Sequence, residues 1–145
     1  MKKALSVYQF RERLLLSIES RAISGIWLAM SYINVPAAIT DIQLGIGIRW
    51  ALNFSYSGLP NDADKDSPAP HTVIGVKTWK AFANEAKCCG MEDEDGIIRL
   101  TPNLLARDGR SDYFEPRVEL IMTLDKGVTD IDLGKAVRQC LSKCE

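Results

Sequence analysis

The most apolar part of the chain runs from Thr40 to Pro60 and contains only two charged residues, Asp41 and Arg49. Its apolar residues fit two periodicities. Every second position from 44 to 56 is large and apolar, which is typical of a β-strand with one buried face. Residues spaced by four positions also form two apolar stripes, which is typical of a helix that is buried on two sides.

The ends of this segment favour the helix. Thr40 and Gln43 fit a capping box, in which a hydroxyl and a side-chain amide oxygen accept hydrogen bonds from free backbone N–H groups. Gly58 suits the left-handed residue past a helix end, and a proline follows it. We therefore predict a helix over residues 40–58 and keep a strand over residues 43–56 as the alternative.

Apolar residues at helical spacing predict two further helices before this segment, over residues 7–19 and 21–33. Another helix is predicted over residues 73–88, where Gly90 can cap the end. The polar, proline-bearing segment 61–70 has no periodicity and predicts a loop. The N-terminal two-thirds of the chain is therefore expected to be helix-rich.

The pattern changes after residue 90. Residues 97–100 form a short apolar run and residues 117–124 alternate between apolar and polar, which predicts an antiparallel β-hairpin near 97–124. Thr129 can cap a C-terminal helix over residues 130–143. The expected fold class is α+β; if residues 43–56 are a strand, the fold becomes a larger antiparallel sheet.

Length and charge constrain the organisation. A chain of 145 residues favours a single domain over 1–145, because a helical segment over residues 1–90 and a hairpin-plus-helix segment over residues 91–145 are each too small to keep a core alone. We recognise no internal repeat and no low-complexity segment. The net charge of -1 gives no basic field, so we expect no general affinity for nucleic acid.

The expected location is the cytoplasm. Arg11 to Arg13 interrupt the apolar N-terminus, which argues against a signal peptide. The uncharged stretch 22–40 has nearly the length of a membrane span, but its polar residues and proline predict a buried helix and a loop, so we expect no membrane partner. The four cysteines are then expected to be reduced thiols.

Catalytic machinery is missing from the sequence. His71 is the only histidine, so a mechanism or metal site that needs two histidines is excluded. Cys88 and Cys89 are adjacent, which suits a zinc site poorly, and Cys140 and Cys144 lie on the apolar stripe of the last helix. We find no phosphate-binding glycine loop. We therefore predict no catalytic residue, no metal and no cofactor.

Two segments carry the composition of a protein-binding surface. One is a run of four carboxylates, and the other is a loop over residues 101–116 that mixes arginines, carboxylates and aromatic residues around a glycine. The candidate partner-binding residues are Glu92, Asp93, Glu94, Asp95, Arg107, Asp108, Arg110, Asp112, Tyr113 and Glu115. A solvated charge run and a self-paired loop remain the alternative interpretations.

The chain resembles the immunity proteins of bacterial contact-dependent growth inhibition systems, in the segments 114–120 and 130–141 and in its size, mild acidity and α+β character. The resemblance implies a small cytoplasmic protein, not an enzyme, that binds and neutralises the toxin domain of a cognate effector. Because many such toxins are nucleases with basic clefts, it also implies a nuclease partner. It assigns no functional residue.

Two other functions remain open at this point. One is a regulatory or structural interaction subunit, indicated by the apolar surroundings of Trp27, Trp50 and Trp79. The other is a ligand-binding enzyme that works without histidine, with a pocket between helices and hairpin. The sequence leaves self-association undecided.

Overall fold

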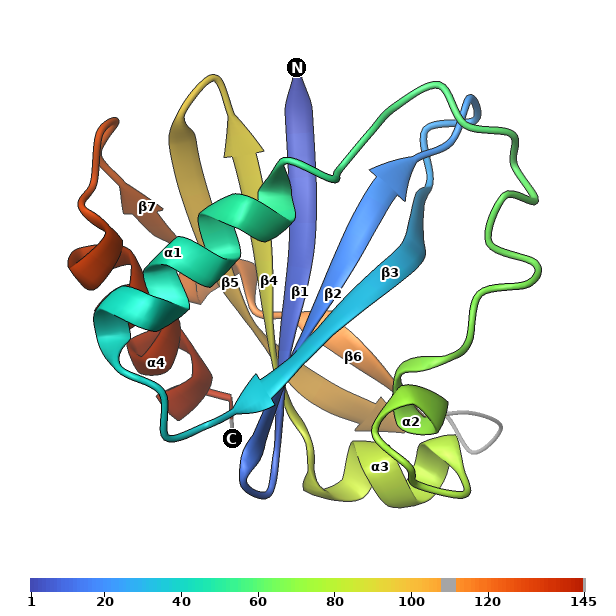
Figure 1. The fold of residues 1–145 in the computed structure, drawn as a ribbon. Helices are drawn as coiled ribbons and strands as arrows, with labels where there is room; N and C mark the ends of the chain where they lie inside the picture. The colour runs from blue at the N-terminus through green and yellow to red at the C-terminus, as the bar shows by residue number, and fades with distance from the viewer. Residues whose placement is uncertain (108–111, 145) are drawn as a thin grey trace.

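A seven-stranded antiparallel sheet forms the centre of the computed structural model, which describes residues 1–107 and 112–144 (Figure 1). The strand order is β3-β2-β1-β4-β5-β6, and β7 pairs with β5 beside β6. The strands are β1 (Lys2–Phe10), β2 (Arg13–Arg21), β3 (Trp27–Pro36), β4 (Lys87–Glu94), β5 (Ile97–Arg107), β6 (Asp112–Pro116) and β7 (Met122–Leu124). The helices are α1 (Asp41–Leu52), α2 (Pro70–Val73), α3 (Trp79–Glu85), α4 (Asp130–Ser142) and the 3₁₀ turn η1 (Val118–Leu120).

The expectation of a helix-rich N-terminal two-thirds is wrong, because sheet dominates the fold. Residues 7–19 belong to the β1–β2 hairpin, and most of residues 21–33 belong to β2 and β3. The helix predicted over 73–88 is much shorter in the structure, where α3 covers only Trp79–Glu85 and β4 begins at Lys87. The alternative of a strand over 43–56 is also wrong, since α1 occupies that segment.

The first hairpin was missed because its strands are covered on both faces. Leu14, Leu15 and Leu16 are all buried, so the apolar residues of β2 form a continuous run without the alternation of a half-buried strand. The turn between Phe10 and Arg13 also lacks glycine and asparagine, and Arg11 itself takes the positive φ of 53°. Neither usual hairpin signal is present.

The start signals of α1 and α4 are confirmed, whereas the predicted helix end at Gly58 is wrong, because α1 ends at Leu52. Thr40 and Gln43 form the capping box at the start of α1, and the Thr129 hydroxyl accepts a hydrogen bond from the Asp132 N–H at the start of α4. The predicted pairing near 97–124 is present only in part, as three register pairs between β5 and β7, because residues 118–120 of the predicted second strand form the 3₁₀ turn η1. Between them, however, β5 continues to Arg107 and pairs with β6 over residues expected to be a loop.

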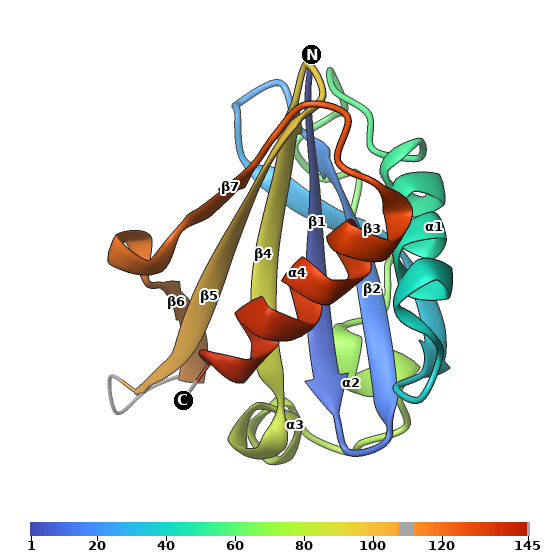
Figure 2. The same ribbon diagram turned by 90° about the vertical axis from the view of Figure 1, so that its left-hand side faces the viewer.

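The two long helices share a sequence motif, so the expectation of no internal repeat is wrong. Residues 40–49 and 129–138 are identical at six of ten positions, in the pattern Thr-Asp-Ile-x-Leu-Gly-x-x-x-Arg. The short length of the motif hides it in the sequence. In the fold the two copies cross in opposite directions on one face of the sheet, as Figure 2 shows from the side.

The shared residues make reciprocal contacts at this crossing. A Cβ on Gly45 would lie 1.8 Å from the Asp130 carbonyl oxygen, and a Cβ on Gly134 would lie 1.9 Å from the Asp41 carbonyl oxygen. Only glycine permits such close backbone approach. The motif thus positions α1 and α4 against each other about a local two-fold axis.

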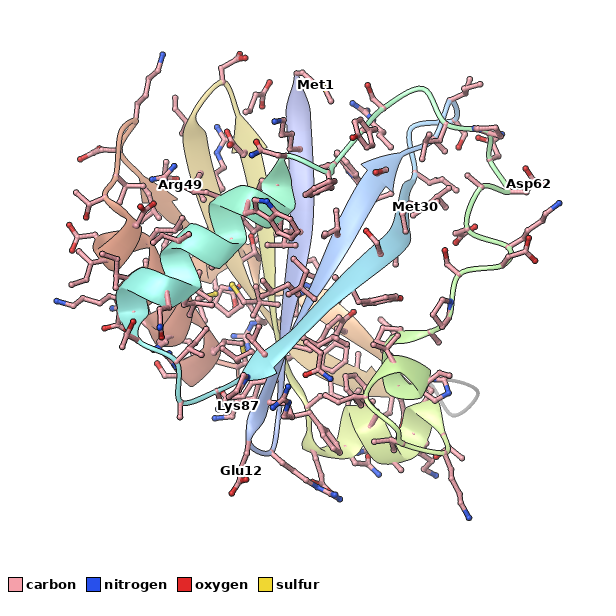
Figure 3. The ribbon with its side chains drawn as sticks, viewed as in Figure 1. Met1, Glu12, Met30, Arg49, Asp62 and Lys87 are labelled. Carbon is pink, nitrogen blue, oxygen red and sulfur yellow. The ribbon has the colours of Figure 1, made fainter. Side chains whose placement is uncertain are left out.

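The shared arginines and aspartates form a matching pair of ionic contacts. The Arg49 Nε lies 2.6 Å from Asp130 Oδ1, and the Arg138 Nε lies 2.8 Å from Asp41 Oδ1. Arg49 also donates to the Val128 carbonyl, while Arg138 donates to the carbonyls of Ala37 and Ile39. Arg49, labelled in Figure 3, thus forms one of the two ion pairs that join α1 and α4.

The two faces of the sheet are covered differently. On the helix face, side chains of α1 and α4 such as Leu44, Ile48 and Val137 pack against the sheet and form the main core. On the opposite face, called the open face below, α3 covers the far end of β1 through a cluster of aromatic rings. The cluster contains Tyr8, Phe10, Trp79, Phe82 and Phe114. The near end of the open face is left with a depression.

Candidate functional site

An acidic groove of about 290 Å³ crosses the open face. Strand alternation sends every second side chain of β1, β2, β4 and β5 to this face. The groove is lined by Ser6, Glu19, Trp27, Glu92, Thr101 and Asn103, among others. It therefore combines two carboxylates, neutral hydrogen-bonding groups and one aromatic side chain, which is a composition suited to a cationic group.

Glu19 is the most unusual residue of the groove. Its carboxylate accepts a hydrogen bond from the Ser6 hydroxyl, and it forms no ion pair among the residues that the structure describes. Burial raises the pKa of Glu19 above its usual value, the Ser6 hydrogen bond lowers it, and the nearby Glu92 raises it again. A largely buried carboxylate with a perturbed pKa marks a candidate binding site.

The predicted carboxylate run lies in the β4–β5 hairpin and is split by it. Glu92 and Glu94 have open-face positions in β4, where the Lys2 Nζ lies 3.5 Å and 3.9 Å from their carboxylates. Asp93 alternates to the helix face, and its Oδ1 accepts a hydrogen bond from the Gly96 N–H. Asp95 lies in the turn, 3.3 Å from the N-terminal amine. Of the four carboxylates only Glu92 lines the acidic groove, and Glu94 lies next to it on the open face.

The second predicted segment lies at the other end of β5. Arg107 lies eight residues beyond Arg99, the register partner of Glu92, which is about 27 Å along β5. Arg107 donates to the Asn84 side chain and lies 4.0 Å from Asp112. Tyr113 and Glu115 alternate to the opposite face from Asp112. Asp108 and Arg110 lie outside the described residues. The structure therefore does not bring the two predicted segments together.

The cysteines divide between the two faces of the sheet. Cys89 and Cys140 lie in the core beneath α4, whereas the Cys88 side chain alternates to the open face, where its thiol accepts a hydrogen bond from the Asn103 amide. The Cys144 Sγ lies 3.1 Å from the Cys88 carbonyl oxygen and 3.3 Å from the Cys140 carbonyl oxygen. All four are free and buried, and burial raises the pKa of Cys88 to about 12. The thiol of Cys88 is therefore held in its unreactive protonated form. Within the described ranges, no group of three or more potential ligands is arranged to hold a metal ion.

Sequence reasoning missed Glu19 because its segment was assigned to a helix. One signal was available: Glu19 closes the apolar run of β2, where a charged side chain is unexpected. A second signal was the dipeptide Asp95–Gly96, which is typical of a two-residue hairpin turn and would have placed Glu92 on a strand. Both residues of that turn have positive φ.

A comparison with protein families bears on the identity of the chain. The model of the CDI immunity protein family, CdiI, matches residues 69–144, which is just over half of the chain. The chain belongs to the CDI immunity protein family. The resemblance found in the sequence is thus confirmed, whereas no curated protein sequence matches the chain. The matched region of this immunity protein contains α3, α4 and the strands from β4 onward.

Two solved structures share the fold of this immunity protein. A Neisseria meningitidis protein of unknown function aligns over 100% of this chain and 96% of its own, with a TM-score of 0.81 and 12% identity. A CdiA-CT/CdiI toxin and immunity complex from Yersinia pseudotuberculosis contains a chain that aligns over 100% of this one and 98% of its own, with a TM-score of 0.79 and 14% identity. At such low identity the likeness establishes the fold alone. In the described part of the chain, no helix is both long and apolar enough to cross a membrane.

Proposed function

We propose that this chain binds the toxin domain of its cognate effector and neutralises it as a non-catalytic inhibitor in the cytoplasm. Membership of the CDI immunity protein family carries the proposal. The Yersinia structure of the same fold is described as a complex of toxin and immunity protein, which supports direct binding as the means of neutralisation. The single histidine and the buried, protonated thiol of Cys88 fit a non-catalytic role.

The proposed toxin is a nuclease, and the proposed contact is the acidic groove. A nuclease needs a basic cleft to bind the phosphates of its substrate. The carboxylates of Glu19, Glu92 and Glu94 can take the place of those phosphates, and their charge would accelerate the encounter by electrostatic steering. Asp93 and Asp95 lie in the same β4–β5 hairpin and are proposed as contacts at its tip.

The second predicted segment, residues 107–115, is proposed as an outer contact. Arg107 and Asp112 have open-face positions beyond the aromatic cluster, so a toxin seated across the whole open face would reach both segments. A standard interface has about 800 Å² on each side, which is large enough for this span. Tyr113 and Glu115 would contribute only at the edge of β6, since they alternate to the helix face.

A calorimetric titration with the purified C-terminal toxin domain of the cognate effector tests the contact. Glu92→Lys and Glu94→Lys are each expected to weaken binding at least tenfold, because they place a positive charge against a basic cleft. Glu12→Lys is the matched control, since Glu12 lies at the tip of the β1–β2 hairpin at the opposite end of β1 (Figure 3). If all three reversals changed affinity equally, the assignment of the groove would be wrong.

A digestion assay tests the nuclease proposal separately. The toxin domain is incubated with plasmid DNA or total RNA, with and without an equimolar amount of the immunity protein. We expect cleavage by the toxin alone and none in the presence of the immunity protein. A toxin that binds the chain tightly and cleaves neither nucleic acid would contradict the nuclease proposal and leave the binding proposal intact.

A further inference from the structure

The outward side of α1 carries an apolar stripe, formed by Ile42, Ile46, Trp50 and Phe54, that nothing in the described chain covers. Ile42, Ile46 and Trp50 are 49%, 53% and 56% exposed, and Phe54, just past the helix end, is 39% exposed. The rings of Trp50 and Phe54 pack edge to face with centroids 4.8 Å apart. Apolar residues at every fourth position form a continuous ridge along a helix, which is the usual surface for packing another helix.

The internal repeat provides a reference for this stripe. The motif aligns the four stripe positions with Ile131, Lys135, Gln139 and Lys143 of α4. The inward positions correspond closely, since Leu44 and Ile48 of α1 match Leu133 and Val137 of α4 and all four are buried. Two helices that pack alike against the sheet thus differ in their outward positions. The stripe of α4 is polar at three of four positions, as solvent exposure favours, whereas that of α1 is entirely apolar.

Gly47 supplies an independent observation beside the stripe, on the half-buried flank of α1 next to Ile46. Glycine in a helix interior costs roughly 1 kcal/mol relative to alanine. The crossing of α1 and α4 explains Gly45 and Gly134, but a Cβ on Gly47 would meet no heavy atom within 4 Å. A helical glycine with open space around it is explained if another backbone approaches closely there.

The stripe also differs in charge from the acidic groove. The only charged residues of α1 are Asp41 and Arg49, and both are paired with α4. The stripe is therefore uncharged, and it lies on the helix face, whereas the groove lies on the open face. If the toxin occupies the groove, as proposed above, the stripe is left for a neutral, apolar partner.

We infer that the stripe binds the same stripe of a second copy of this chain. In a two-fold dimer one surface serves both partners, and two-fold dimers are the commonest oligomers. The Gly47 positions of the two copies would lie near the helix crossing, in the way that Gly45 and Gly134 lie at the crossing inside one copy.

The exposed area suits a small, reversible interface. Burying an isoleucine side chain removes roughly 100 Å² of apolar surface from water and an aromatic one about 150–250 Å². The exposed fractions of the four stripe residues then leave on the order of 300 Å² per copy. A standard interface offers about 450–500 Å² of apolar surface on each side. The dimer is therefore expected to dissociate in the micromolar range.

Sedimentation velocity of the isolated chain tests the inference without any toxin. We expect the sedimentation coefficient to rise from that of a monomer to that of a dimer between micromolar and hundreds of micromolar protein. The double variant Ile46→Lys/Trp50→Gln gives α1 the outward residues of α4 and should remain monomeric throughout. The control variant Ile131→Lys changes the outward side of α4 and should dimerise like the wild type. A wild-type chain that is monomeric at every concentration would overturn the inference.

Cross-linking through an introduced cysteine locates the contact between the two copies. Because the native cysteines are buried, Gly47→Cys introduces an accessible thiol. Mild oxidation should link two Gly47→Cys chains and should not link Gln139→Cys chains, whose thiol lies on α4. Equal linkage of both variants would contradict a crossing near Gly47. If Ile46→Lys/Trp50→Gln instead abolished toxin binding by a monomeric chain, the stripe would belong to the toxin and the second copy would be excluded.

Discussion

At the residue scale, Gly45 and Gly47 have opposite roles although they are two positions apart. Gly45→Ala would push a methyl group against the backbone of Asp130, so it should lower the free energy of unfolding by about 1–3 kcal/mol or more. Gly47→Ala meets no atom and should raise it by roughly 1 kcal/mol. Urea unfolding of dilute protein compares the two. A Gly45→Ala variant as stable as Gly47→Ala would contradict the close helix crossing.

The buried charge of Glu19 is expected to lower the stability of the folded chain and to strengthen its binding of the toxin domain. Because its pKa is raised in the folded chain, its contribution to stability is present at pH values below its ordinary pKa and is lost as the pH rises through the folded value. Glu19→Gln removes the loss of stability that accompanies ionisation of Glu19. The variant should therefore unfold at a higher temperature than the wild type at neutral pH and at nearly the same temperature near pH 4. The same variant should bind the toxin domain more weakly.

Thermal unfolding at the two pH values, followed by the toxin titration, checks this prediction. The Ser6 hydroxyl can still donate to a glutamine oxygen, so the variant keeps its local hydrogen bond. A Glu19→Gln variant that is less stable than the wild type at neutral pH would contradict the unfavourable burial of this charge.

At the element scale, the repeated motif ties the loop before α1 to α4. Arg138 contacts Asp41 and the carbonyls of Ala37 and Ile39. Because both charged side chains remain about one-third exposed, Arg138→Met should lower the free energy of unfolding by roughly 1–2 kcal/mol. Arg11→Met removes the exposed pair with Glu85 and should have no measurable effect. Equal effects of the two variants in urea unfolding would contradict a structural role for the motif.

Local signals were sufficient for the capped helices and insufficient for the sheet. Thr40 and Thr129 fix the starts of α1 and α4 by hydrogen bonds to the next turn, so the sequence near each residue predicts the helix. The β1–β2 hairpin depends on burial of Leu14 to Leu16 on both faces of the sheet, which arises only in the folded chain, where α1 packs against β2 on the helix face. The groove was unpredictable for the same reason, because Glu19 and Glu92 become neighbours only through β1.

At the scale of the whole molecule, the sheet separates two surfaces of different chemistry. The open face carries the acidic groove, and the helix face carries the uncharged stripe of α1. A toxin on one face and a second copy on the other could therefore bind at the same time. This arrangement predicts that Ile46→Lys/Trp50→Gln leaves the toxin affinity of the chain unchanged, while Glu92→Lys leaves its dimerisation unchanged.

The most direct measurement is growth of bacteria that produce the cognate toxin domain together with this chain. Cells with the toxin alone should stop growing, and cells that also contain the wild-type chain or Glu12→Lys should grow normally. The triple variant Glu19→Gln/Glu92→Lys/Glu94→Lys, produced at the same soluble level, should fail to protect. Growth arrest in the presence of the wild-type chain would contradict its role as the immunity protein, and full protection by the triple variant would contradict the acidic groove as the toxin-binding surface.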